Sequence, residues 1–474
     1  MGQEIESSHF RHKDFHRFKR RLEDETRLLA QWLDERRFVD GGLIGGFELE
    51  VWLVDEQGRP APVNERYLAL AQQQGLPVVS ELARFNLELN SSPRPLHGDA
   101  LSAMYDELNA TWRQCDLLAQ TLNCRLVMIG ILPMVTESQL SLGNMSQVRR
   151  YKALNEQILR MRQGRPLQLD IAGREHLRTV HRDVMTEAAT TSFQLHLQAP
   201  QAQAAHYYNL ARLISAPMVA LVANSPFLFG YDLWDETRIP LFEQSVAVGG
   251  NAGGGARVTF GDAYVRSSLF ECFQRNLEDY PVLLPSVMDE PPERLAHVRL
   301  HNGTIWRWNR PLIGFEPDGR PHLRLEHRVV PAGPTVADAI ANAAFFFGVM
   351  AGLQRLTGAD ERIDFATARS NFYTAARLGL RAEIVWLDKK TVSVAELLTD
   401  DLLPLAHRGL NALGVDRADV DNFLAIIAGR LRTGQNGAAW QRAYVAKHGA
   451  DFQALTLAYL EHQNRGAPVH EWTI

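Results

Sequence analysis

The sequence contains little cysteine. Cys115, Cys124 and Cys272 are the only three in 474 residues, and none of them are paired at CxxC spacing. A disulfide-rich secreted scaffold needs more cysteines than this, and a zinc ribbon needs them at closer spacing. The usage is typical of a reducing cytoplasm, so we expect a cytoplasmic protein, and we interpret Cys272 as a core residue and not as a nucleophile.

Positive charge is not in excess either. The chain has 50 Lys and Arg against 55 Asp and Glu, a net charge of −5, which argues against binding to nucleic acid. The N-terminal stretch has no apolar segment typical of a secretory signal. Residues 214–230 are the apolar run that we place nearest to a membrane span, but two prolines in it favour a core segment. We therefore expect no membrane association.

No internal repeat or low-complexity segment is present, so the fold class depends on the pattern of apolar residues. Strands are predicted within residues 45–62, 83–95, 124–133, 185–200 and 321–334. Helices are predicted over residues 9–37, 98–121, 203–223 and 336–356, and from about 360 to 464 we expect helices only. This pattern favours an α+β fold with one antiparallel sheet and helices packed on one side of it.

Carboxylates occur inside the predicted strands, where apolar residues are expected. In GFELEVWLVD, Glu48 and Glu50 share one face of the strand because side chains alternate with a period of two. Burying two ionised carboxylates side by side costs several kcal/mol each unless a cation neutralises them. The arrangement recurs at Glu88 in FNLELN, at His196 in FQLHLQ and at Glu326 in LRLEHR. Oxygen-rich sites with one imidazole suit Mg²⁺ or Mn²⁺.

Each of these positions also has a simpler interpretation. Glu88 alone fits a strand edge that faces water, and a lone His196 fits a hydrogen-bonded core histidine. Glu326 lies beside His327 and Arg328 and fits a structural ion pair. Four polar positions of this kind in one chain favour a divalent-metal site on a sheet, and the residue pattern by itself leads no further.

Six segments, in order, resemble motifs of the carboxylate–amine ligases of glutamate–cysteine ligase type, which share the glutamine synthetase fold. They are GFELEVWLVD, FNLELNSSP, VALVANSPFLFG, GTIWRWNRP, HLRLEHRVVP and NFYTAARLGLRAEIVW. The resemblance implies a glutamine synthetase-like antiparallel sheet that lines an active-site cleft, with helices on its outer face. It implies a catalytic domain over residues 40–390, an N-terminal helix within residues 1–39 packed on that domain, and a helical C-terminal region over residues 391–474.

The resemblance also implies a reaction and its residues. ATP phosphorylates a carboxylate, typically the γ-carboxylate of glutamate, and an amine such as that of cysteine attacks the acyl phosphate. Arg328 and Arg310 are implied as catalytic contacts to phosphate, and Gln194 and Arg377 as substrate-binding residues. The implied cofactors are ATP and Mg²⁺, with Mn²⁺ as an alternative. The implied metal ligands are Glu48, Glu50, Glu81, Glu88, His196 and Glu326.

Several alternatives stay open. Gln194 stands where many family members have histidine, and Pro331 stands where the family often has aspartate, so the acid and the amine are not fixed. A ligase for another amine, a non-catalytic ligand-binding homologue and a metal-dependent hydrolase are the rival functions. The loop GGNAGGGA lacks the Lys-Ser/Thr ending of a P-loop, so an active-site loop or a plain connector fits it better. We expect small-molecule partners, and the helical ends leave room for a homo-oligomer.

Overall fold

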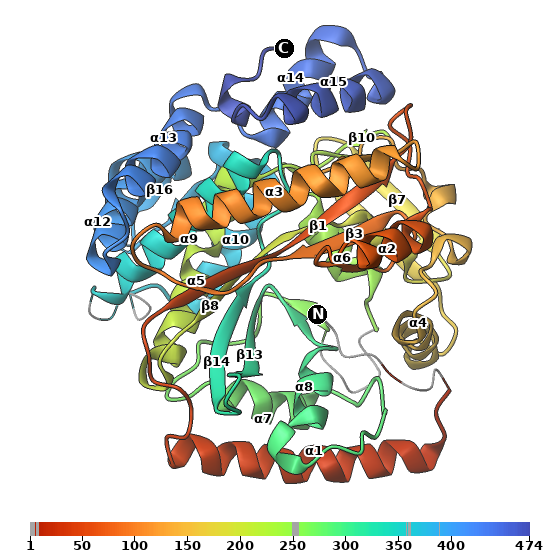
Figure 1. Ribbon diagram of the computed structural model, residues 1–474, viewed down its shortest axis with the longest axis vertical. Coiled ribbons are helices and arrows are strands. Elements are labelled where there is room, and N and C mark those ends of the chain that lie inside the picture. Colours follow the sequence, from red (N-terminus) through yellow and green to blue (C-terminus); the bar gives the residue numbers. More distant parts are fainter. Residues whose placement is uncertain (1–4, 6–8, 249–255, 357, 359–361, 388) are drawn as a thin grey trace.

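The computed structural model describes residues 5, 9–248, 256–356, 358, 362–387 and 389–474 (Figure 1). Residues 249–255, which form most of the loop GGNAGGGA, lie outside the described residues. The role expected of this loop therefore stays a prediction.

An eight-stranded antiparallel sheet forms the centre of the molecule. Its order is β13-β14-β8-β1-β3-β2, and β4 and β5 pair with opposite ends of β1. The strands are β1 (Ile44–Val54), β2 (Val78–Ser80), β3 (Asn86–Asn90), β4 (Arg94–Pro95), β5 (Arg125–Val127), β8 (Phe193–Gln198), β13 (Asn309–Phe315) and β14 (Pro321–His327). Because β1 is 11 residues long, it pairs with four other strands and sets their register.

Long helices cover one face of this sheet (Figure 1). They are α3 (Ala100–Gln120), α5 (Gln201–Val222) and α9 (Val336–Gln354). The odd-numbered residues of β1, such as Phe47 and Leu49, are buried on this side. On β14, the ring of His327 stacks on Phe346 of α9 with centroids 4.6 Å apart. The even-numbered residues of the same strands therefore face away from these helices.

Helix α9 is the one described helix long and apolar enough to cross a bilayer, and 94% of its apolar window is buried inside the protein. Residues 214–230 were expected to come nearest to a membrane span, but α9, which was predicted only as a helix, is the stronger candidate by length and composition, with Asp338 as its only charged residue. Residues 214–222 belong to α5 and are buried, as expected of a core segment.

The other helices surround the sheet and form the C-terminal region. They are α1 (His12–Asp34), α2 (Asn64–Gln73), α4 (Arg149–Met161), α6 (Arg238–Ser245), α7 (Phe270–Asp279), α8 (Ala296–Asn302), α10 (Phe365–Leu378), α11 (Val394–Glu396), α12 (Leu403–Leu413), α13 (Arg417–Thr433), α14 (Gly437–His448) and α15 (Phe452–Arg465). Cys272 is buried in α7, in agreement with its interpretation as a core residue. Helix α1 lies at the opposite end of the molecule from α14 and α15 (Figure 1).

Three strand predictions were wrong in detail. The chain after residue 360 is not helical throughout, because β15 (Glu383–Val385) and β16 (Thr391–Ser393) form a short hairpin. Strands of three residues are too short to show a period. Strand β13 was not predicted because Pro311 interrupts its pattern, and an edge strand tolerates proline. Of the predicted strand 185–200, residues Met185–Ala189 form a 3₁₀ turn and only β8 is extended.

Smaller two-stranded sheets complete the fold. They pair β6 (Leu167–Ala172) with β7 (His176–His181), β9 (Phe227–Leu228) with β10 (Tyr231–Asp232), and β11 (Val258–Thr259) with β12 (Trp306–Arg307).

Candidate active site

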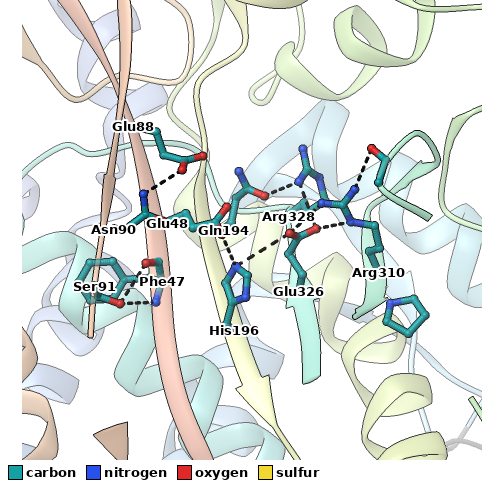
Figure 2. Close-up of polar contacts among 12 residues, drawn as sticks. Phe47, Glu48, Glu88, Asn90, Ser91, Gln194, His196, Arg310, Glu326 and Arg328 are labelled. Carbon is teal, nitrogen blue, oxygen red and sulfur yellow. Dashed lines mark hydrogen bonds and ion pairs between the residues drawn. The ribbon is translucent and has the colours of Figure 1, made fainter. Parts of the chain in front are cut away.

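Four strands of the main sheet bring carboxylates and one imidazole together on the face that the long helices leave open. The register places Glu50 opposite Glu88 between β1 and β3, and Glu48 opposite Gln194 between β1 and β8. His196 of β8 lies opposite Glu326 of β14. Figure 2 shows Glu48, Glu88, His196 and Glu326 converging from these strands. The acidic residues among them line a cavity, and Glu81, which follows β2, lines it too.

Glu48, His196 and Glu326 form the first of two groups. Nε2 of His196 lies 3.5 Å from Oε1 of Glu48 and 3.9 Å from Oε1 of Glu326, and these three residues offer ligand atoms all within 4.8 Å of one another. His196 Nε2 is buried yet makes no hydrogen bond with any described residue. Burial lowers the pKa of His196 to about 4, so its imidazole is neutral at pH 7, the form that binds metals.

Glu50, Glu81 and Glu88 form the second group, with ligand atoms again within 4.8 Å of one another. Burial raises the pKa of Glu50 to about 7; the charge of Glu88 adds to this rise, while Arg328 opposes it. Burial and the charge of Glu50 raise the pKa of Glu81 to about 7. Burial and the charges of Glu48 and Glu81 raise the pKa of Glu88 well above its usual value. If all three were ionised they would repel one another, and a divalent cation between them would remove that repulsion.

Two arginines fix the carboxylate of the first group. Nε and Nη2 of Arg310 donate to the two oxygens of Glu326 at 2.8 and 2.9 Å, and Arg328 Nη1 donates to Glu326 Oε2 at 3.1 Å (Figure 2). Although burial favours the neutral acid, these guanidiniums lower the pKa of Glu326 well below its usual value. Glu326 is therefore ionised throughout the physiological range of pH.

Gln194 links the two groups. Its Nε2 donates to Glu50 Oε1 at 2.9 Å, and its Oε1 accepts a short hydrogen bond from Arg328 Nη1. The Ser192 backbone N–H holds the other oxygen of Glu50 at 2.6 Å. The Gln194 amide thus orients Glu50 and Arg328 at the same time.

A buried ion pair behind the cavity holds the backbone that carries Arg328. Nη1 and Nη2 of Arg238 donate to the carbonyl oxygens of Arg328 and Val329 at 3.1 and 2.6 Å, and its Nε donates to Glu236 at 3.0 Å. Glu236 also accepts the Asn224 backbone N–H at 2.9 Å. The segment ANSP, which begins at Ala223, and α6 therefore lock the end of β14 in place.

Arg377 is the predicted site residue that the structure places in neither acidic group nor in the cavity lining. Its side chain is exposed at the end of α10, and it is not among the residues that line the cavity. Its backbone carbonyl accepts the N–H of Asp235 at 3.2 Å, and the carbonyl of Ala376 accepts that of Glu236 at 2.9 Å. This segment supports the turn before α6, and a role of the Arg377 side chain in binding stays a prediction.

The cavity also contains charged residues that the sequence analysis missed. They are Arg150 on α4, Glu187, Arg299 on α8 and Arg324 on β14. Burial and the charges of Glu81 and Glu50 raise the pKa of Glu187 well above its usual value. Arg324 shares the strand face of Glu326 and Arg328, so period-two alternation was a signal that could have found it. The other three lie on helices or turns, where no strand period marks them.

The residues present fit divalent cations. Five carboxylates and one neutral imidazole are a donor set suited to Mg²⁺ or Mn²⁺. The buried Nε2 of His196, aimed between two carboxylates, and the mutual repulsion of the second group are what a cation would satisfy. The lining of the cavity also includes the apolar residues Phe242, Val246, Phe273, Leu284, Trp306 and Ile313.

Comparison with known proteins identifies the family. The model of glutamate–cysteine ligase family 2 matches residues 44–458. The chain belongs to glutamate–cysteine ligase family 2. The match covers every strand of the main sheet and both groups of carboxylates, and as a member of this family the protein is an ATP-dependent carboxylate–amine ligase. The glutamine synthetase-like antiparallel sheet, with helices on its outer face, is confirmed.

Two solved structures resemble this family member over most of its length. The glutamate–cysteine ligase of Francisella tularensis in complex with AMP is 11% identical, with 92% of this chain and 96% of that chain covered and a TM-score of 0.48. A bifunctional glutathione synthetase from Pasteurella multocida is 11% identical, with 92% and 54% covered and a TM-score of 0.47. No curated protein matches the sequence significantly. The family assignment rests on the family match and not on these two structures.

Proposed function

We propose that the protein joins a carboxylate, with the γ-carboxylate of glutamate as first candidate, to an amine, with cysteine as first candidate, through an acyl phosphate. The observation that carries this proposal is the pair of acidic groups, Glu48–His196–Glu326 and Glu50–Glu81–Glu88, side by side on one sheet face with arginines between them. Phosphoryl transfer needs charge neutralisation at this density, and hydrolysis of a neutral bond does not.

The two groups would each hold Mg²⁺, with Mn²⁺ as an alternative. When bound, the metals would neutralise the charge on the transferring phosphoryl group and its leaving group. His196 contributes the one nitrogen ligand, and its neutral state requires no proton to leave before a metal binds. Among the second group, Glu50 and Glu81 must lose protons that they hold up to about pH 7.

The arginines have different parts in this proposal. Arg310 offers its fork to both oxygens of Glu326, so it orients that ligand. Arg328 donates to Gln194 and Glu326 through Nη1 and lines the cavity, so its other N–H groups are the proposed contacts to the transferring phosphoryl oxygens. Arg324 lines the same wall and is open to an anionic group of a substrate. The apolar residues of the cavity lining suit the nucleobase of ATP.

A panel of acids and amines tests the proposal. Purified protein with Mg²⁺ and ATP is given glutamate or another amino acid, with and without each amine, and ADP and the amide product are measured. We expect ADP release that depends on both the acid and the amine, in equal amounts with the amide. Release with no dependence on the amine would contradict ligation, and turnover without ATP would favour the hydrolase.

The cellular location and the oligomeric state of the protein are also part of this proposal. All three cysteines are free and buried, which fits a reducing compartment, and we propose a cytoplasmic enzyme. Small molecules are the proposed partners, and no surface formed by the described residues argues for a particular oligomer.

A further inference from the structure

Helix α1 lies against the part of the structure that closes one end of the cavity, and the family match begins only after it, at residue 44. It packs on α7, α8 and the turn Pro292–Arg294, across the lower end of the molecule in Figure 1. Most of its buried face is apolar: Phe18, Leu22, Leu29, Trp32 and Leu33. These residues are sufficient to attach an amphipathic helix to the body.

Glu25 is the one charged residue on this buried face. It is 1% exposed, and its carboxylate accepts three hydrogen bonds from the start of α8. Oε2 accepts the backbone N–H of His297 at 2.8 Å and that of Val298 at 3.0 Å, and Oε1 lies 2.6 Å from Nδ1 of His297. The Met288 N–H donates to Nε2 of the same ring at 3.2 Å, so the imidazole proton is on Nδ1 and points at Glu25.

A buried carboxylate is a costly way to attach a helix, because an apolar side chain at this position would anchor α1 at least as well. Unlike an apolar side chain, the carboxylate also fixes the orientation of α8. Three donors that converge on two oxygens fix both the position and the rotation of the first turn of α8, whose backbone N–H groups have no partners within the helix.

Helix α8 carries this orientation into the cavity. Arg299, Leu300 and Asn302 line the cavity wall, and so does Gly303 immediately after the helix. Asn302 Nδ2 donates to the carbonyl of Pro311 at 2.8 Å, which ties the end of α8 to β13. The Gly303 carbonyl accepts from Arg310 Nη1 at 3.4 Å, and Arg310 holds Glu326. A shift at the start of α8 therefore reaches both the cavity wall and the arginine that orients a proposed metal ligand.

We propose that Glu25 is a positioning residue for the ligase reaction, which acts by setting α8 so that Arg299 and Asn302 stand correctly in the cavity wall. The inference rests on the proposed function in one respect, that this cavity is where the substrates bind. It makes α1 part of the catalytic unit, although the helix lies outside the matched family region and supplies no residue to the cavity.

Kinetics of Glu25→Gln test this inference, with Glu23→Gln as the matched control two residues away on the same helix. We expect Glu25→Gln to raise the KM of a substrate by about tenfold while kcat stays within about threefold, because misplaced binding groups weaken binding more than chemistry. Arg299→Gln should raise the KM of the same substrate. The KM of the double variant should be no higher than that of the single variant with the higher KM, because both substitutions act through α8.

Hydrogen exchange of the α8 amides gives a second readout that needs no turnover. Exchange over residues 297–304 should be faster in Glu25→Gln than in the wild type and unchanged in Glu23→Gln. If Glu25→Gln does not fold, Glu25→Asp is used, since it keeps the charge and shortens the reach by one methylene.

The inference is overturned if α8 exchange is unchanged, if KM values stay at the wild-type level, or if the effects of Glu25→Gln and Arg299→Gln simply multiply. A wild-type protein without amine-dependent ADP release contradicts the proposed function instead. In that case, the exchange of α8 still decides whether Glu25 positions it.

Discussion

At the scale of single residues, the acidic groups explain why polar side chains interrupt the strands. Glu50 and Glu88 lie opposite each other on paired strands, a placement that destabilises a sheet when both are charged. The protein accommodates this pair by keeping protons on its carboxylates, as the raised pKa values of Glu50 and Glu88 indicate. A cation that displaced those protons would turn the repulsion into coordination.

This arrangement predicts how the stabilisation by Mg²⁺ depends on pH. In the metal-free protein, Glu50 and Glu81 keep protons up to about pH 7, whereas in the unfolded chain they lose them near 4.5. The folded state therefore binds more protons between pH 4.5 and 7, and its stability falls as pH rises through that window. Mg²⁺ competes with these protons, so we expect Mg²⁺ to bind at least about tenfold more weakly at pH 5.5 than at 7.5.

Thermal unfolding with Mg²⁺ or with a chelator, at pH values from 5.5 to 8.5, measures this dependence. The increase in Tm on adding Mg²⁺ should grow with pH and level off above about 7. Glu50→Gln should remove most of the increase and all turnover while the fold stays intact, and Glu56→Gln, at an exposed position, is the control. An equal effect of Mg²⁺ at every pH would remove Glu50 and Glu81 from the metal site.

Arg328 gives a second test at the residue scale. Its Nη1 is shared between Gln194 and Glu326, so the rest of the planar guanidinium is held in a fixed direction. A lysine at this position keeps the charge but loses the fork and its direction. We expect Arg328→Lys to lower kcat by roughly 30-fold or more, and Arg320→Lys, an exposed change, to leave it unaltered. Near-normal kcat in Arg328→Lys would make Arg328 a structural residue.

At the scale of elements, the strands were predicted only where their pattern was strong. Strands β1, β3, β8 and β14 were found because apolar residues flank each polar one, and the same period placed Glu48, Glu50, His196 and Glu326 on one face. Strand β13 and the β15–β16 hairpin were missed, since a proline and very short strands hide the period. The β6–β7 hairpin was missed as well, although the residues of β6 alternate between buried and exposed. Glu81 came from the family resemblance, because no strand periodicity marks it.

Three other charged residues of the cavity could not be predicted, because no local sequence pattern marks them and only tertiary packing brings them to the site. Arg150, Glu187 and Arg299 reach the cavity from α4, a 3₁₀ turn and α8, and only the packing of these elements on the sheet brings them there. Arg377 shows the reverse case. Its segment matches a family motif, yet the structure uses the backbone of that segment and leaves the side chain exposed.

The close packing of β1 on α9 gives a prediction at the element scale. A Cβ atom at Gly45 would lie 2.7 Å from Leu96 Cδ2 and 2.8 Å from Phe347 Cζ, so an alanine there requires these buried side chains or β1 itself to shift. We expect Gly45→Ala to lower the free energy of unfolding by about 1–3 kcal/mol. Gly42→Ala is the matched control, because no atom lies within 4 Å of its added Cβ.

Urea unfolding followed by circular dichroism measures both glycine variants. Equal stabilities for Gly45→Ala and Gly42→Ala would show that β1 and α9 are not closely packed. Because β1 carries Glu48 and Glu50, we also expect Gly45→Ala to weaken Mg²⁺ binding.

At the scale of the whole molecule, the single long strand β1 explains how distant segments form one site. It pairs with β3 on one side and with β8 on the other, and β8 pairs in turn with β14, so residues from position 48 to position 328 meet on one face. The helices α3, α5 and α9 cover the other face and leave this one free. The architecture therefore supports a reaction that needs charge from many parts of the chain at once.

The transfer of oxygen from the acid to phosphate tests the central claim most directly. The acid substrate is labelled with ¹⁸O in both oxygens of its reacting carboxylate and is incubated with ATP, Mg²⁺ and the amine. An acyl phosphate keeps one labelled oxygen as the bridge to phosphorus, and attack of the amine on the carbon releases that oxygen with phosphate. We predict one ¹⁸O atom in each phosphate released, in equal amount with the amide, as measured by mass spectrometry. Phosphate that carries no ¹⁸O while ADP accumulates would contradict the account.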